Sequence, residues 1–409
     1  MSGEVLPVPD RVWDGVGDRP VARSRVLVRG GRVAEVGERV TAPAGADVVD
    51  LAGHTLLPGF IDCHVHVVDE SLDTAPVAEQ TVRAIPPLRT LPANGFTTVR
   101  DLGGSDQPIT TALRDAVADG VVPGPRMVVA PNILSARGSH GDKEPELTAR
   151  FGVEVGVVAD GASEVVRRVR EQAGAKADWI KFAGSGGFSS AVDSPTDVGY
   201  SQAEVDALVA AASDLGLPCA GHAFNDEAVV RAVRAGVRSV EHGSLIGRDT
   251  LDLLVRRRVP LVPTWYCVEH LLDRVDDGEF RAGRPPEVRE KLRGHADGLR
   301  ATAALVAGSD VVPAFGTDAG LFPHEDNWRE FPTMARLGVE PVRALRAATS
   351  VAADLLDRPD LGRVAPGATA DLVAVPGDPF EDIEVTGQVG FVMREGSVVL
   401  HRAGGVSRL

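Results

Sequence analysis

Two kinds of hydrophobic pattern divide this chain. Near the N-terminus, short apolar runs at 26–28 and 33–37 flank the turn Arg29-Gly30-Gly31-Arg32. Short apolar runs bounded by turn residues predict strands, and glycines between two strands predict a hairpin. The pattern recurs near the C-terminus, at residues 370–375, 390–393 and 397–400. We therefore expect residues 1–57 and 364–409 to pair into one small β-sandwich domain, with a frayed tail from Arg402.

Residues 58–363 have a different pattern, in which short apolar runs alternate with segments of helical period. Eight runs predict strands: one that ends at His66, and those at 97–100, 126–130, 179–182, 218–222, 239–242, 260–264 and 313–318. The clearest helix begins at Ser201, where Glu204 completes a capping box. Alternating strands and helices predict a parallel sheet, and eight repeats favour a (β/α)8 TIM barrel over an open sheet. The fold class is therefore α/β.

Two stretches within the barrel stand apart from this alternation. Residues 268–312 are rich in charge and contain a helical run at 287–307, so we expect a cap or an extended crossover near the barrel mouth. Residues 138–160 show little periodicity and predict a loop.

Composition and charge exclude several kinds of partner. The chain is 44% hydrophobic and 25% charged, which is typical of a globular protein. A formal net charge of −15 argues against binding to nucleic acid or to an anionic membrane. Three cysteines in dissimilar contexts offer no disulfide framework, which favours a reducing cytoplasm. The sequence shows no signal-peptide pattern and no apolar run of about 18 residues.

Residues with metal-ligating side chains gather at the ends of the predicted strands, where barrel enzymes carry their active sites. His64 and His66 are one strand repeat apart, so both imidazoles face the same way. His222 and His242 end two later strands, and Asp318 ends the last. Each residue alone has a structural explanation, as a core histidine or, for Asp318, as a turn cap. Their joint occurrence at successive strand ends favours a metal site.

Lys181 adds a second kind of ligand. A lysine is normally at the surface, but Lys181 lies in an apolar strand between Ile180 and Phe182. Burial lowers the pKa of a lysine and leaves a neutral amine. Such an amine can react with carbon dioxide to give a carbamate, whose oxygens can bridge two cations.

These motifs resemble the amidohydrolase superfamily. The segments that carry the resemblance are 58–66, 180–182, 221–223, 240–243 and 316–320, together with 12–15, 28–33 and 362–372 near the ends. The resemblance implies a binuclear centre, usually of Zn²⁺, with His64, His66 and Asp318 on one ion and His222 and His242 on the other. A CO2-derived carbamate on Lys181 and a hydroxide would bridge the ions, and Asp318 would move the proton from the hydroxide to the leaving amine.

Within the superfamily, residues 180–182 and 185–187 look most like the prolidase-like group. This group contains Xaa-Pro dipeptidases, arginine or lysine carboxypeptidases and ochratoxinase-like amidases, which cleave an amide next to a free carboxylate. The resemblance implies a hydrolase of C–N bonds whose partner is a small molecule with a free carboxylate, such as a dipeptide or an N-acyl amino acid. Superfamily members often form homo-oligomers.

Five further residues are candidates to bind the substrate. His140 and Arg137 can both donate charge-assisted hydrogen bonds to a carboxylate. Phe224 stands where some dipeptidases have a tyrosine, which weakens a direct transfer of dipeptidase activity. Tyr266 and His324 follow the seventh and eighth strands and are candidates to face the pocket, although core packing explains Tyr266 equally well.

Two other functions stay open. A protein with the same fold and metal site can hydrolyse a lactone, a cyclic amide or an organophosphate ester. A non-catalytic metal-binding protein is the alternative from another class, and the intact set of ligand residues argues against it.

Overall fold

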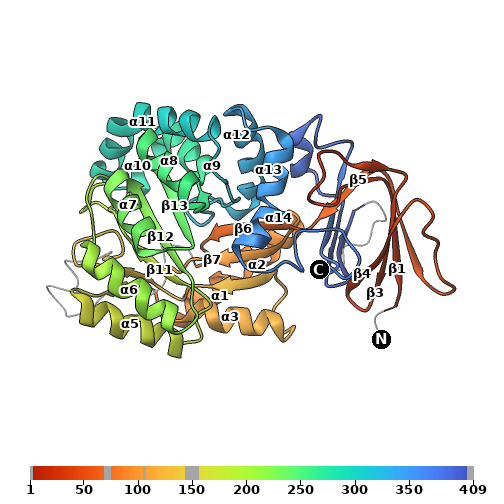
Figure 1. Ribbon diagram of the computed structural model, residues 1–409, viewed down its shortest axis with the longest axis horizontal. Helices are drawn as coiled ribbons and strands as arrows, with labels where there is room; N and C mark the ends of the chain where they lie inside the picture. Colours follow the sequence, from red (N-terminus) through yellow and green to blue (C-terminus); the bar gives the residue numbers. More distant parts are fainter. Residues whose placement is uncertain (1–2, 69–74, 105–106, 143–155, 403–409) are drawn as a thin grey trace.

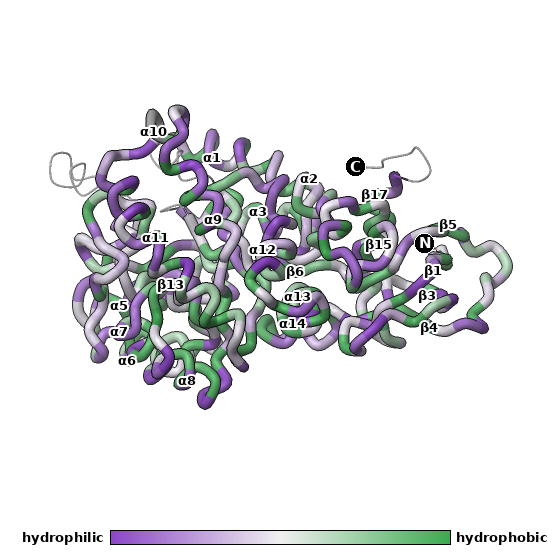
Figure 2. Tube along the Cα trace, turned by 90° about the horizontal axis from the view of Figure 1, so that it is seen from above, coloured by the Kyte–Doolittle hydropathy of each residue, from purple (hydrophilic) through white to green (hydrophobic). Residues whose placement is uncertain are grey.

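The computed structural model describes residues 3–68, 75–104, 107–142 and 156–402 (Figure 1). The loop expected at 138–160 and the tail expected from Arg402 lie largely outside these described residues. The chain forms a (β/α)8 barrel joined to a small β-sandwich domain, as the hydrophobic pattern predicts. Both views show the β domain at one end of the molecule, beside the barrel (Figure 1 and Figure 2).

Strands from both ends of the chain form the β domain. They join into one eight-stranded sheet of order β17-β16-β15-β5-β1-β3-β4, with β2 paired to β1. The N-terminal strands are β1 (Val5–Val12), β2 (Val21–Ala22), β3 (Arg25–Arg29), β4 (Arg32–Gly37) and β5 (Asp47–Pro58). The C-terminal strands are β15 (Leu372–Pro376), β16 (Phe391–Arg394) and β17 (Ser397–His401). The expected hairpin is therefore the β3–β4 pair.

The sheet curves so that its two halves share a core. Val26 and Leu51 from the N-terminal strands belong to one buried apolar cluster with Leu372 and Phe391 from the C-terminal strands. The β3–β4 turn also meets the segment before β15, where the Ala370 N–H donates to the Gly31 carbonyl over 2.9 Å. Neither end could bury its apolar face alone, which explains why both are needed. The domain boundaries at 57/58 and 363/364 stay a prediction.

Eight segments enclose the barrel. Seven contain regular strands: β6 (Phe60–Val65), β7 (Phe96–Asp101), β8 (Arg126–Val129) continued as β9 (Ile133–Ser135), β11 (Ile180–Ala183), β12 (Cys219–Asn225), β13 (Ser239–Leu245) and β14 (Leu261–Val262). The short β10 (Val157–Val158) pairs with β9. The eighth segment, 313–319, is held by single parallel bridges, Leu261 to Pro313 on one side and Val65 to Ala319 on the other. These bridges close the barrel.

Helices surround the strands and extend over one end of the barrel. Their bounds are α1 (Val77–Arg83), α2 (Ile85–Ala93), α3 (Ile109–Ala118), α5 (Ala162–Gly174), α6 (Gln202–Asp214), α7 (Asp226–Ala235), α8 (Arg248–Arg257), α9 (Trp265–Arg274), α10 (Gly278–Gly283), α11 (Pro286–Ala307), α12 (Glu330–Arg336), α13 (Pro341–Ala347) and α14 (Ser350–Leu355), with short 3₁₀ helices η2 (His324–Arg329) and η3 (Ile383–Gly387). The capping box of Ser201 and Glu204 at the start of α6 is confirmed. Among the described helices, none is long and apolar enough to cross a membrane.

Candidate metal centre

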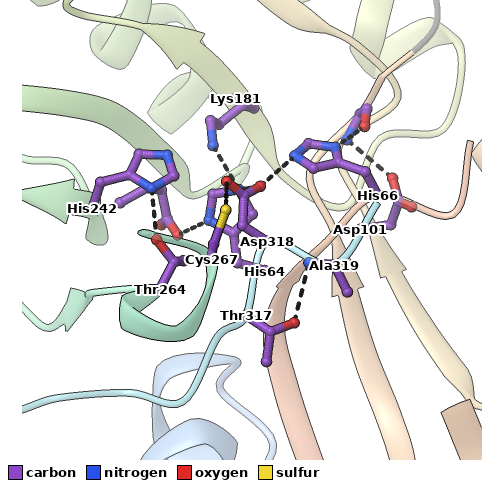
Figure 3. A network of polar contacts seen from close by, with 12 residues as sticks. His64, His66, Asp101, Lys181, His242, Thr264, Cys267, Thr317, Asp318 and Ala319 are labelled. Atoms are coloured by element: carbon purple, nitrogen blue, oxygen red, sulfur yellow. Dashed lines mark hydrogen bonds and ion pairs between the residues drawn. The ribbon is translucent and has the colours of Figure 1, made fainter. Parts of the chain in front are cut away.

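One cavity at the carboxyl ends of the barrel strands collects the predicted ligand residues. All six line it and are buried: His64, His66, Lys181, His222, His242 and Asp318. They come from β6 and the residue that follows it, from β11, β12 and β13, and from the eighth segment, so the barrel brings together side chains that are far apart in the sequence. Figure 3 shows five of them around a common centre.

Asp318 lies at the middle of this cluster. Its Oδ1 is 3.3 Å from Nε2 of His64 and 3.2 Å from Nε2 of His66. Nζ of Lys181 is 3.4 Å from Nε2 of His64. His64, His242 and Asp318 each place one ligand atom within 4.8 Å of those of the other two. The separations among His64, His66 and Asp318 suit donors around one cation, and His242 lies beside this group.

The second ring nitrogen of each histidine has an oxygen partner. Nδ1 of His64 is 2.9 Å from Oε2 of Glu241, and Nδ1 of His66 contacts the Gly103 carbonyl. Nδ1 of His242 is 2.9 Å from Oγ1 of Thr264. Nε2 of His222 is 3.3 Å from the Gly186 carbonyl. Metal-ligating histidines typically hold their other N–H in this way, which fixes the ring and its tautomer. The donor set therefore fits a metal site.

Backbone geometry explains how neighbouring residues of one strand both face inward. Side chains in a regular strand alternate, so Glu241 and His242 should point to opposite faces. His242 instead has a left-handed φ of 70°, and the register between β12 and β13 shifts at this point. Thr264 and Asp318, with φ of 51° and 62°, are left-handed too. Such residues cost roughly 1–3 kcal/mol each and cluster at functional sites.

Gly316 allows the eighth segment to approach the ligands. A Cβ atom at this position would lie 2.9 Å from Cβ of His64 and 2.2 Å from Cγ1 of Val262. Only glycine fits between β6 and β14 here, and the Asp318 carboxylate reaches the histidines as a consequence.

Burial lowers the pKa of four of the candidate ligands, His64, Lys181, His222 and His242, whereas at His66 burial is outweighed by the Asp318 carboxylate, which raises the pKa. Loss of solvent lowers the pKa of Lys181 to about 8, against the opposing charges of Glu241 and Asp318. The same cause holds the pKa of His222 and of His242 well below its usual value. Neutral imidazoles and a partly neutral amine are the forms that bind metal or react with carbon dioxide.

The structure brings two of the five substrate-binding candidates to the cavity. His140 lines it and stacks on His222 with ring centroids 4.3 Å apart. Phe224 lines it and stacks on His242 at 4.9 Å.

The other three candidates are not among the described residues that line this cavity. Arg137 has a side chain that is 54% exposed and lies 3.7 Å from the Asp160 carboxylate. The Tyr266 ring packs on Phe322. His324 is buried, with Nε2 3.0 Å from the His66 carbonyl.

Sequence reasoning missed the apolar wall of the cavity. Most of it comes from α9, α11 and the loops around the barrel mouth: Ile133, Phe188, Val268, Leu271, Leu292, Leu299 and Leu321. Residues 268–312, expected as a cap or an extended crossover, therefore supply part of this wall, but in the sequence their leucines look like ordinary core positions of amphipathic helices. Glu241 was also missed, although a carboxylate beside His242 in an apolar strand is a detectable signal.

Comparison with known proteins identifies the class. The sequence model of the amidohydrolase family matches residues 55–399. This chain therefore belongs to the amidohydrolase family, and it is a hydrolase that acts on amide C–N bonds.

Similar proteins place it more closely, in the prolidase-like group. A solved Xaa-Pro dipeptidase with methionine bound in its active site is 32% identical, with a TM-score of 0.89 over 97% of this chain and 99% of that one. A prolidase in complex with N-methylphosphonate-L-proline is also 32% identical, with a TM-score of 0.88 over 97% of this chain and 100% of the other. Ochratoxinase of Aspergillus niger is 27% identical over 358 residues, which cover 81% of this chain and 72% of that protein.

Proposed function

We propose that the protein is a binuclear metal-dependent hydrolase that cleaves the amide bond of a dipeptide or an N-acyl amino acid. The observation that carries this proposal is the convergence of four histidines, a lysine and an aspartate on one buried cavity. The similarity to a Xaa-Pro dipeptidase, a prolidase and an ochratoxinase supports an amide next to a carboxylate as the substrate.

The ligands divide into two groups in this proposal. His64, His66 and Asp318 would hold one cation, and His222 and His242 the other, with Lys181 carrying a CO2-derived carbamate between them. Zn²⁺ is the ion that we propose, because an imidazole-rich set suits it. When bound, the ions would supply a water of lowered pKa and polarise the scissile carbonyl.

Asp318 would transfer the proton, and His140 would bind one end of the substrate. The Asp318 carboxylate is close enough to the centre to take a proton from the attacking water and pass it to the leaving amine. His140 is the residue that we assign to the substrate carboxylate, because it lines the cavity whereas the Arg137 side chain lies beside Asp160. Leucines and phenylalanines around the cavity favour a substrate with an apolar side chain.

A panel of hydrolysis assays tests the proposal. The chelated protein, reloaded with zinc and bicarbonate, is incubated with N-acyl amino acids, dipeptides, lactones, cyclic amides and organophosphate esters. We expect metal-dependent turnover of amides that carry a free carboxylate. Turnover of lactones or phosphate esters without any amide hydrolysis would contradict the proposal and favour the other hydrolase functions.

We also propose a cytoplasmic location. Cys63, Cys219 and Cys267 are buried and none forms a disulfide, which supports a reducing compartment. Fractionation of the producing cells should recover the protein with a cytosolic marker. Recovery from the medium or the membrane pellet would contradict this location.

A further inference from the structure

The loop between β11 and α6, residues 184–199, folds back on itself beside the cavity. Ser185 and Val198 form an antiparallel bridge, and the Gly199 N–H donates to the Gly184 carbonyl over 2.9 Å. The stem of this loop is therefore fixed by its own backbone. Its tip, residues 187–193, extends to α11.

Lys291 of α11 binds this tip. Its Nζ donates to the carbonyls of Gly187, Ser190 and Asp193 at 2.9, 2.5 and 2.6 Å, and lies 3.2 Å from Oδ1 of Asp193. The lysine side chain is only 14% exposed. An ammonium group has three donors, so three carbonyls satisfy it and the carboxylate balances its charge.

Asp193 connects the lysine to the cavity. Its side chain is 1% exposed, and its second oxygen, Oδ2, accepts from the Gly187 N–H at 3.0 Å and lies 3.3 Å from Nδ1 of His140. The two carboxylate oxygens thus have different partners, Lys291 on one side and His140 on the other.

The His140 ring is also held at its faces. It stacks on His222, with an angle of 13° between the ring planes. The Gly187 backbone packs so closely that a Cβ atom there would lie 2.4 Å from Nδ1 of His140. A ring that is held at Nδ1 and packed by His222 and Gly187 has one orientation, and Nε2 is the ring atom that would meet a ligand in the cavity.

We propose that Lys291 and Asp193 are positioning residues for His140. Lys291 holds the loop tip, and the tip places the Asp193 carboxylate so that the imidazole meets the substrate carboxylate in a fixed orientation. This inference rests on the proposed function only for the substrate that His140 contacts. The benefit comes from preorganisation, because the ring and the loop do not have to be ordered when the substrate binds.

Kinetics of Asp193→Asn and Lys291→Met test this proposal. For each variant, KM is measured for a substrate with a free carboxylate and for its carboxamide analogue, alongside metal content. Because a charge-assisted contact is lost, KM for the free acid should rise roughly tenfold or more. KM for the carboxamide and the metal content should change little. Lys291→Arg keeps the charge, so its KM for the free acid should lie between those of the wild type and Lys291→Met.

Controls separate positioning from a general loss of structure. Lys176→Met, which removes a lysine that is 74% exposed, should leave both KM values unchanged. In a His140→Ala background, Asp193→Asn should have no further effect on KM, because contacting residues are not additive. An equal rise in KM for the acid and the carboxamide would overturn the proposal. A double variant in which the two effects on KM add would also overturn it.

A crystal structure of Lys291→Met separates this inference from the proposed function. If the wild type hydrolyses no amide, the proposed function fails. The position of the His140 imidazole in the variant still shows whether Lys291 positions that ring. We expect the His140 ring to leave its stack on His222 in the variant. A ring in the wild-type position would overturn the inference.

Discussion

Arg100 and Glu241 form an ion pair inside the barrel, with Nη2 of the arginine 2.9 Å from Oε1 of the glutamate and both side chains fully buried. Oε2 of Glu241 lies 2.9 Å from Nδ1 of His64. Arg100 also donates to the Cys63 carbonyl over 2.6 Å and lies over the Trp179 ring. The pair therefore fixes the His64 ring to the barrel wall. Although burial raises the pKa of Glu241, Arg100 and the bond to His64 hold it well below its usual range.

Arg100→Met should destabilise the metal-free protein strongly. Removing one partner leaves the Glu241 charge buried and unpaired, which typically costs about 3–5 kcal/mol. Urea denaturation measures the effect. Arg167→Met, which breaks an exposed pair with Glu171 on α5, is the control and should leave the midpoint unchanged. Similar midpoints for the two variants would contradict the structural role of Arg100.

Asp318→Asn should separate catalysis from metal binding. The amide oxygen keeps a ligand atom but cannot take up the proton, so kcat should fall roughly 10²–10⁴-fold while bound metal is largely retained. Asp249→Asn, which makes the same change at an exposed position in the first turn of α8, is the control and should leave kcat unchanged. Unchanged kcat in Asp318→Asn would favour a non-catalytic role for the residue.

Asp193 should contribute stability that depends on pH. Burial acts to raise the pKa of Asp193, but the bond to His140 and the charges of His140 and Lys291 lower it from 3.8 to about 2. Since the folded-state pKa is the lower one, this stability is present above pH 4 and is lost as the pH falls through about 2. Asp193→Asn should cost about 2 kcal/mol at pH 7 and progressively less below pH 4. A difference that stays constant with pH in denaturant titrations would argue against this ionisation.

Leu292→Ala should change substrate preference. This buried residue of α11 lines the cavity, and removal of its side-chain carbons should lower kcat/KM for substrates with a leucine or phenylalanine side chain roughly tenfold relative to glycine. Leu254 of α8 is equally buried and is not among the described cavity residues. Leu254→Ala should therefore reduce stability without altering the preference. If Leu254→Ala changed the substrate preference as much as Leu292→Ala, the assignment of Leu292 to the substrate cavity would be refuted.

Local pattern predicted much of the fold and the six residues that the structure gathers in the candidate site. Residues such as His64 and Asp318 are recognisable because polar side chains that end apolar strands meet at one end of a barrel. The eighth segment was expected as a strand, yet it makes only isolated bridges, and Asp318 within it has a left-handed φ of 62°. Strand propensity does not predict such a conformation for an aspartate.

Contacts between distant segments set the rest of the site. Arg137 follows the third strand, as a carboxylate-binding residue would, but its backbone N–H donates to the Asp160 carboxylate and its side chain lies beside the same group. Lys291 looks like a surface lysine of an amphipathic helix, and only the fold of residues 184–199 gives it buried partners. Neither relationship has a local signal in the sequence.

The number of metal ions per chain tests the central claim most directly. After chelation, reloading with zinc and bicarbonate, and removal of free metal, elemental analysis should find two zinc ions per chain in the wild type. Lys181→Ala, which cannot form a carbamate, should hold fewer. One ion or none in the wild type under these conditions would contradict the binuclear centre.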